Sequence, residues 1–166
     1  MHCVILGTDH RLQKQDRALR AKIEHLVQSN DVGLIAEECL AGTETVASEC
    51  ALALGLPPRL AIDMTTEQRV AAGIYERLCI RPAIHFDIDQ NTLHERHLYL
   101  RHADGIREEF WLDRVQEAAT DGTVLLICGY VHIDFLAQKA IRRDHTVATV
   151  VFPEDLPERI EFDILD

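Results

Sequence analysis

The chain has 166 residues, the size of one domain, and 47% of them are hydrophobic, enough for a core that needs no disulfides. Its 28 Asp and Glu residues outnumber its 17 Lys and Arg residues, which gives a net charge of -11. An acidic surface disfavours phosphate backbones and anionic membranes, so we expect neither nucleic acid nor a membrane as a partner.

The first predicted element is a strand over residues 3–6, an apolar run that is closed by Gly7 and followed by His10. A short apolar run that ends at glycine is typical of a strand buried on both faces and ending in a tight turn. Residues 12–29 are predicted to form a helix, because apolar side chains recur there at helical spacing, namely Leu19, Ile23, Leu26 and Val27.

A second apolar strand is predicted over residues 32–36, and it runs directly into Glu37 and Glu38. Because side chains alternate along a strand, we expect only one of these two carboxylates to face a site. A helix over residues 43–54 follows, with Gly55 suited to its C-terminal cap.

The third predicted strand is short, covers residues 60–62 and ends at Asp63. Thr65 and Gln68 have the spacing of a capping box at the start of another helix. Gly73 weakens this helix, whose expected apolar face consists of Val70, Ile74 and Leu78.

Residues 81–103 show no sustained hydrophobic period, and we expect a His- and Asp-rich loop or lid there. Asp104 is placed to cap a helix that runs to residue 119. The expected buried face of this helix consists of Glu108, Trp111, Leu112, Val115 and Ala119.

The pattern of the first strand recurs near the end of the sequence. A strand over residues 123–128 meets Gly129, and His132 follows at the same spacing as His10 after Gly7. A helix over 132–142 and a last strand over 146–152 complete the predicted elements.

Alternating strands and helices predict an α/β fold, a three-layer single domain with a mostly parallel five-stranded sheet. We expect the strand order 3-2-1-4-5, with a ligand crevice where the chain reverses between the first and fourth strands. This arrangement would bring His10, His132 and the Glu37/Glu38 pair together, with Asp63 one strand further out.

Imidazole and carboxylate groups together suit a divalent metal such as Zn, Mn, Fe or Co, which would activate a bound water. A histidine held by a glutamate can also act as a general base without metal. Packing or helix capping by His10 and His132 is the competing interpretation.

Other residues give weaker signals. His94 and His97 are three residues apart, whereas the H-E-x-x-H motif needs four, so we expect a solvated loop there. Cys128 is expected in the core, and Glu108 beside Arg107 could be a plain buried ion pair. The sequence has no G-x-G-x-x-G, P-loop lysine or G-x-S-x-G, so no nucleotide cofactor is expected.

The five cysteines are odd in number and form no C-x-x-C pair, which favours free thiols in a reducing compartment. The sequence has no basic, cleavable N-terminal segment and no apolar run that approaches 18 residues. We therefore expect a cytoplasmic protein.

The paired G-x-x-H motifs, the strand-end glutamate and the segment Arg107-Glu108-Glu109-Phe110-Trp111 come in an order that resembles a known superfamily. It comprises Tiki and TraB-type metalloproteases, erythromycin-esterase-like enzymes and ChaN-like proteins. The resemblance implies a site with His10, His132 and Glu37 or Glu38 at its core, as metal ligands or water-activating groups, flanked by Arg107 and Glu108.

We therefore expect a hydrolase that acts on a peptide, ester or other small substrate, with Arg107 binding an oxyanion or a substrate carboxylate. Trp111 should lie near this site. The alternative is a non-catalytic module of the same fold that binds a small ligand or a protein partner, and a homo-oligomer is possible in either case.

Overall fold

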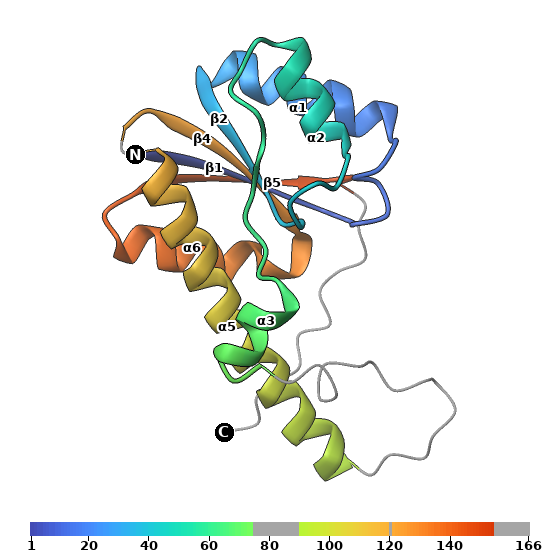
Figure 1. The fold of residues 1–166 in the computed structure, drawn as a ribbon, viewed down its shortest axis with the longest axis vertical. Coiled ribbons are helices and arrows are strands. Elements are labelled where there is room, and N and C mark those ends of the chain that lie inside the picture. The colour runs from blue at the N-terminus through green and yellow to red at the C-terminus, as the bar shows by residue number, and fades with distance from the viewer. Residues whose placement is uncertain (75–89, 120, 155–166) are drawn as a thin grey trace.

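The computed structural model describes residues 1–74, 90–119 and 121–154 (Figure 1). Strands and helices alternate through most of this part of the chain. In chain order the elements are β1 (His2–Thr8), α1 (Arg17–Ser29), β2 (Val32–Glu37), α2 (Val46–Ala53), β3 (Leu60–Ala61), α3 (Thr66–Ala71), α5 (Gln90–Ala118), β4 (Thr123–Gly129), the 3-10 turn η1 (Tyr130–His132), α6 (Ile133–Arg142) and β5 (Thr146–Phe152).

All five strands are parallel and form one sheet, which confirms the predicted α/β class. The strand order is β3-β2-β4-β1-β5, so the predicted order, with β1 between β2 and β4, was wrong. The expected pairing of β1 with β4 is confirmed, but β4 lies between β1 and β2.

Burial explains this order. In both β1 and β4 six of the seven residues are buried, and both strands take interior positions with neighbours on two sides. The edges are occupied by β5, in which exposed and half-buried residues are interspersed, and by the two-residue β3. Strands with apolar side chains on both faces are the ones that a parallel sheet buries most fully.

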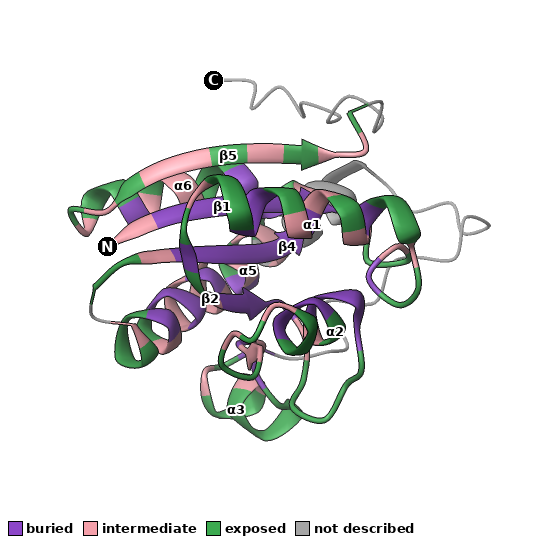
Figure 2. Ribbon diagram, turned by 90° about the horizontal axis from the view of Figure 1, so that it is seen from above, coloured by how far each residue is buried: buried purple, intermediate pink, exposed green. Residues whose placement is uncertain are grey.

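Helices cover both faces of the sheet and give three layers (Figure 2). On one face α1 and α2 pack against the strands, and the core there includes Leu6, Leu19, Ile23, Ile35, Val46, Leu125 and Ile127. On the other face α5 and α6 do so, with Ile5, Ala36, Trp111, Leu112, Leu126, Cys128, Ile133 and Leu136. Cys128 lies in this core, as expected.

Capping side chains determine where the helices begin. The side chain of Asp16 accepts a hydrogen bond from the backbone of Leu19, so α1 begins at Arg17 rather than at residue 12. The capping box of Thr65 and Gln68 is confirmed. The helix that it opens is shorter than predicted, because Gly73 has a φ of +79° and lies beyond the end of α3. Leu78 lies outside the described residues.

The long helix α5 differs most from the prediction. It begins at Gln90, so the loop expected over 81–103 is helical from residue 90 onward, and Asp104 lies inside the helix rather than at its cap. Residues 81–89 are outside the described part of the chain. The first half of α5 extends past the sheet (Figure 1).

Candidate functional site

Glu38 occupies the carboxyl edge of the sheet, directly after β2. Its side chain is 4% exposed, and both of its oxygens are engaged. Oε1 accepts a hydrogen bond from Arg107 at 2.5 Å, and Oε2 accepts one from the backbone N–H of Gly129 at 2.8 Å. The carboxylate is therefore fixed by a side chain of α5 and by the end of β4.

The imidazole of His10 lies against one oxygen of this carboxylate. Its Nε2 is 3.5 Å from Glu38 Oε2, and its Nδ1 is 3.2 Å from Oε1 of Gln13. Gln13 is buried, and its backbone carbonyl accepts a hydrogen bond from Val46 at the start of α2. The loop that carries His10 is thus attached to a helix, while the side chain of His10 remains 55% exposed.

The imidazole of His132 approaches the other oxygen. Its Nε2 is 3.8 Å from Glu38 Oε1, and its Nδ1 is 2.9 Å from Oε1 of Glu108. Both rings therefore have Nδ1 beside an oxygen acceptor and Nε2 facing Glu38. The ring of Trp111 meets that of His132 edge to face at a centroid distance of 4.9 Å, so Trp111 lies beside the site as expected.

Glu38 connects the two helical layers. His10 follows β1 and is anchored through Gln13 to the layer of α1 and α2. His132 packs against Trp111 in the layer of α5 and α6. The structure therefore brings together one glutamate and two histidines that are far apart in sequence, at the carboxyl ends of β1, β2 and β4.

The two glycines of the G-x-x-H motifs provide space rather than tight turns, as neither has a positive φ. A Cβ atom added to Gly129 would lie 2.8 Å from Nε2 of His10 and 3.5 Å from Oε2 of Glu38. A Cβ atom added to Gly7 would lie 2.0 Å from Cδ1 of Ile133 and 2.9 Å from Cα of Tyr130. Each glycine therefore leaves room for the residues that follow the other one.

Glu37 is directed away from the two histidines, as strand alternation predicts for one of the pair. Its Oε2 accepts a hydrogen bond from the hydroxyl of Thr45 at 2.6 Å and lies 3.2 Å from Nε of Arg59. Burial raises the pKa of Glu37, although Thr45 and Arg59 oppose the effect. Burial also raises the pKa of the neighbouring Cys39 thiol to about 12, so this cysteine is a poor nucleophile.

Arg107 pairs with three carboxylates, and the predicted ion pair with Glu108 is not among its partners. It donates to Glu38, to Asp63 at 3.1 Å and to Asp104 at 3.3 Å. Burial would lower the pKa of Arg107, but Glu38 and Asp63 raise it. Burial alone would raise the pKa of Asp63, yet the guanidinium groups of Arg107 and Arg69 lower it. Arg107 therefore remains charged and holds Glu38 in place.

Glu108 is fully buried and holds His132. Besides His132, its carboxylate lies 3.5 Å from Nζ of Lys139 and 3.9 Å from Arg101. The position expected on the buried face of the helix is thus confirmed, with His132 rather than Arg107 as the closest partner.

Sequence reasoning missed the supporting residues Gln13, Asp104 and Lys139. Lys139 follows His132 by two helical turns, which was a usable signal, whereas nothing in the sequence linked Asp104 to Arg107 beyond their spacing. His94 and His97 lie in α5, not in a loop, but their side chains are outside the described part of the structure.

No group of three or more His, Cys, Asp or Glu side chains among the described residues is arranged as metal ligands. Both oxygens of Glu38 already accept hydrogen bonds, and the charge of Glu38 is balanced by Arg107. The residues present therefore do not fit a metal as they stand, and the metal predicted from the sequence stays a prediction.

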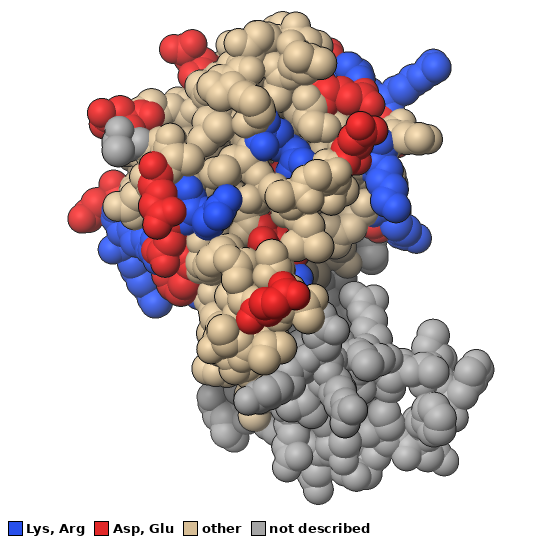
Figure 3. Space-filling view, in the orientation of Figure 1, with Lys and Arg blue, Asp and Glu red and all other residues tan. Residues whose placement is uncertain are grey.

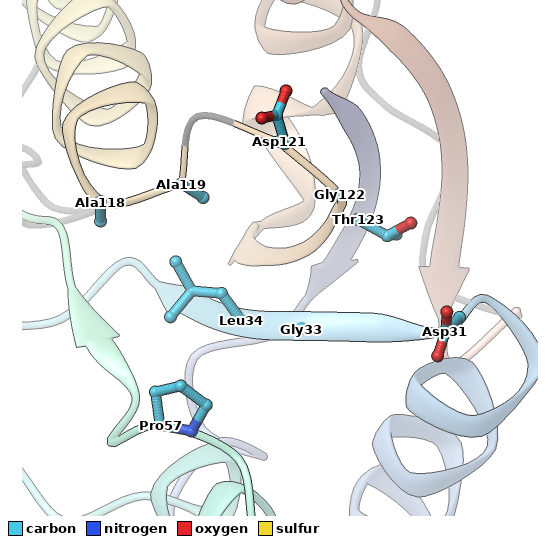
Figure 4. Close-up of a pocket in the computed structure, with 9 residues that line it drawn as sticks. All are labelled: Asp31, Gly33, Leu34, Pro57, Ala118, Ala119, Asp121, Gly122 and Thr123. Atoms are coloured by element: carbon cyan, nitrogen blue, oxygen red, sulfur yellow. The ribbon is translucent and has the colours of Figure 1, made fainter.

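Two hollows lie near the sheet ends. One of about 390 Å³ lies at the opposite edge, between Leu34, Pro57, Ala118 and the turn before β4 (Figure 4). The other, of about 420 Å³, is lined by residues 11, 12 and 14–16 of the loop that carries His10. The second is lined by residues that directly follow His10 in sequence, but neither hollow has His10, Glu38 or His132 among its lining residues.

Comparison with known proteins found no matching family model, no matching curated protein and no matching solved structure. Within the described residues, no helix is long and apolar enough to cross a membrane.

Proposed function

We propose that this chain is a hydrolase in which His10, Glu38 and His132 hold and activate a water molecule. The observation that carries the proposal is the convergence of two imidazole Nε2 atoms on one buried carboxylate, at 3.5 and 3.8 Å. The resemblance to the Tiki, TraB and erythromycin-esterase-like superfamily supports the same reaction class.

Hydrogen-bonding chemistry favours water as the group that these side chains bind. Because Nδ1 of each histidine faces an oxygen acceptor, each ring has its proton on Nδ1 and a lone pair on Nε2. The carboxylate already accepts from Arg107 and Gly129, so among the described residues the two Nε2 lone pairs are the acceptors left to satisfy. A water molecule donates two hydrogen bonds and satisfies both.

His10 is the base in this proposal, because it is the one member of the three that is open to solvent. Its Nε2 takes a proton from the water while the water oxygen attacks the carbonyl carbon of the substrate. The same proton then passes to the leaving oxygen or nitrogen as the bond to carbon breaks. The carboxylate of Glu38 stabilises the positively charged imidazole in between.

The other residues position these three. Glu108 fixes the ring of His132, and Arg107 fixes Glu38. The N–H groups of Arg107 therefore bind Glu38 in this proposal and not the substrate. No step in this scheme uses a metal. The four cysteines among the described residues are free, and three of them are buried, which suits a reducing compartment; we place the activity in the cytoplasm on that basis.

The test is hydrolysis of 4-nitrophenyl esters and of peptide 4-nitroanilides by the purified chain, with and without chelator. His10→Ala, Glu38→Gln and His132→Ala should each lower kcat/KM by roughly 100-fold or more. The exposed residues His25 and Glu44 supply the matched controls His25→Ala and Glu44→Gln, which should change nothing.

Activity that chelators abolish would overturn the metal-free mechanism. Activity that survives all three site substitutions, or a folded wild-type chain that hydrolyses none of these compounds, would overturn the assignment of the site. Ligand binding without turnover would instead support the alternative of a binding module.

A further inference from the structure

The outer edge of β5 is the longer of the two edges of the sheet. Among the described residues β5 pairs with β1 alone, over all seven of its residues and without a bulge (Figure 2). The strand at the other edge, β3, has only two residues. An exposed strand edge presents a row of backbone N–H and C=O groups, and charged residues, proline or bulges usually prevent such a row from pairing with another chain.

β5 has none of these protective features. The residues of Thr146–Phe152 include no charged side chain and no proline, although 27% of the whole chain is charged. On the face drawn in Figure 3, by contrast, acidic and basic side chains lie next to each other. Each chain has a net charge of -11, so two copies can approach most closely through an uncharged surface such as this one.

The backbone groups that face the open edge follow from the pairing with β1. The N–H of Thr146 donates to the carbonyl of Met1, so the backbone of Thr146 faces β1. Because backbone groups alternate along a strand, the N–H and C=O groups of Val147, Thr149 and Val151 face outward. These three residues are symmetric about Thr149. A second β5 that runs in the opposite direction can therefore pair with all of them through about six backbone hydrogen bonds.

The helix beside this edge also exposes apolar surface. α6 contacts both β1 and β5, whereas Arg114 of α5 reaches Ala61 in β3, at the opposite edge of the sheet. Lys139 of α6 is directed toward α5, where its Nζ lies 3.5 Å from a carboxylate oxygen of Glu108. Ile141 is two residues later and about 200° further around the helix. It therefore lies on the side of α6 away from α5, and it is 58% exposed.

The spacing of strands and helices favours a second copy as the partner. Because α6 covers β1 and β5, pairing of two β5 strands places the two α6 helices two strand spacings apart, on the order of 10 Å. The axes of packed helices are about 8–10 Å apart. One arrangement therefore pairs the backbone edge and covers Ile141 in both copies, whereas an added strand without a helix would leave Ile141 exposed.

We propose that β5 forms the interface of a symmetric homodimer, in which the two sheets join through antiparallel β5 strands and the two α6 helices pack against each other. The two-fold axis passes beside Thr149, so that Thr149 is opposite the partner's Thr149 and Val147 is opposite the partner's Val151. This proposal does not depend on the hydrolase function. The candidate site, at the carboxyl ends of β1, β2 and β4, remains outside the interface.

Sedimentation velocity of the full chain, from about 1 μM to about 200 μM, tests the dimer. The share of dimer should rise with concentration and also with salt, because salt screens the repulsion between two acidic copies. Thr149→Lys places two ammonium groups opposite each other, and Ile141→Glu places carboxylates between the helices. Each should raise the Kd of the dimer about tenfold or more. Circular dichroism checks that these variants, both at exposed positions, remain folded.

The matched controls are Thr66→Lys in α3 and Leu52→Glu in α2. Both positions are exposed, Leu52 at 84%, and both lie outside β5 and α6. The control substitutions add the same charges to the same residue types, so they should change the Kd of the dimer by less than about twofold.

Cysteine substitutions test the register of the two strands. Thr149→Cys places two thiols on directly paired residues, whose Cα atoms are about 5.5 Å apart and within the range of a disulfide. Val147→Cys places them four residues apart along the strands, about 14 Å, which is too far. A mild oxidant should therefore link Thr149→Cys into a covalent dimer, but neither Val147→Cys nor the wild type.

A wild-type chain that stays monomeric throughout this concentration range would overturn the proposal. Slow hydrogen exchange at the amides of Val147, Thr149 and Val151 in that monomer would assign the edge to residues 155–166 of the same chain, and fast exchange would leave it to another protein. A dimer that either Thr149→Lys or Ile141→Glu leaves intact, or equal cross-linking at positions 147 and 149, would also overturn it.

Discussion

Alanine substitutions at Gly129 and Gly7 should have opposite consequences, although each lies in a buried strand next to the site. An alanine at 129 would place its Cβ atom 2.8 Å from the far end of the His10 side chain. That side chain is 55% exposed and can swing outward. An alanine at 7 would meet the side chain of Ile133 at 2.0 Å and the backbone of Tyr130 at 2.9 Å, and a packed core cannot move away as easily.

The magnitudes follow from these contacts. Gly129 has a φ of -58° and a ψ of 135°, which alanine adopts without strain. The reduced freedom of the unfolded chain stabilises such a variant by about 0.4–1 kcal/mol, which offsets the displacement of His10. Gly7→Ala overpacks the core and should cost about 1–3 kcal/mol, or roughly 2–12 °C in Tm for a chain of this size.

Gly129→Ala should therefore melt within a few degrees of the wild type and lose most of its hydrolytic activity, roughly 100-fold in kcat/KM, because a displacement of the catalytic base on the order of 1 Å has that effect. Gly7→Ala should be clearly destabilised and lose activity only in proportion to its unfolding. Calorimetric melts and ester hydrolysis at 15 °C measure both quantities. A fully active Gly129→Ala variant would refute the placement of His10 over Gly129.

Substitutions at four further residues test the surroundings of the site. Glu108→Gln keeps the shape but removes the charge that holds His132, and should lower kcat/KM roughly 10–100-fold; an unchanged rate would contradict the role of Glu108. Gln13→Leu removes the acceptor for Nδ1 of His10 and should lower kcat/KM about tenfold, whereas Gln13→Glu restores an acceptor and should recover the rate while displacing the pH–rate profile. The raised pKa of Glu37 stabilises the fold below the ordinary glutamate pKa range, and this stabilisation is lost as the pH rises. The difference in Tm between Glu37→Gln and the wild type should therefore shift in favour of the variant between pH 4 and pH 7. The lowered pKa of Asp63 contributes stability above the ordinary aspartate range, so Asp63→Asn should lower Tm at pH 7 and approach the wild type as the pH falls below 3.

The sequence was most informative where burial alone determines the structure. The apolar runs that form β1 and β4 predict strands buried on both faces, and the polar residues that follow them fall at one edge of a parallel sheet. The meeting of His10, Glu38 and His132 follows from this pattern. This prediction does not depend on the exact strand order, because β1, β2 and β4 are close together in both the predicted and the observed arrangement.

The strand order and the first half of α5 were not predictable in the same way. The strand order depends on which strands gain most from having a neighbouring strand on each side. That comparison involves every strand of the sheet at once. The first half of α5 extends past the sheet, and its sequence lacks the apolar stripe by which a helix is recognised. The partners of Arg107 depend on how α5 crosses the sheet edge, so no local pattern indicates that it binds Glu38 and Asp63 rather than Glu108.

A kinetic double-mutant cycle on His10 and His132 tests most directly whether the two histidines serve one site. Because residues that act as a unit are not additive, His10→Ala/His132→Ala should lose little more activity than the worse single variant. Losses that multiply, so that the double variant falls by the product of the two single effects, would mean that the histidines act independently and would contradict the account.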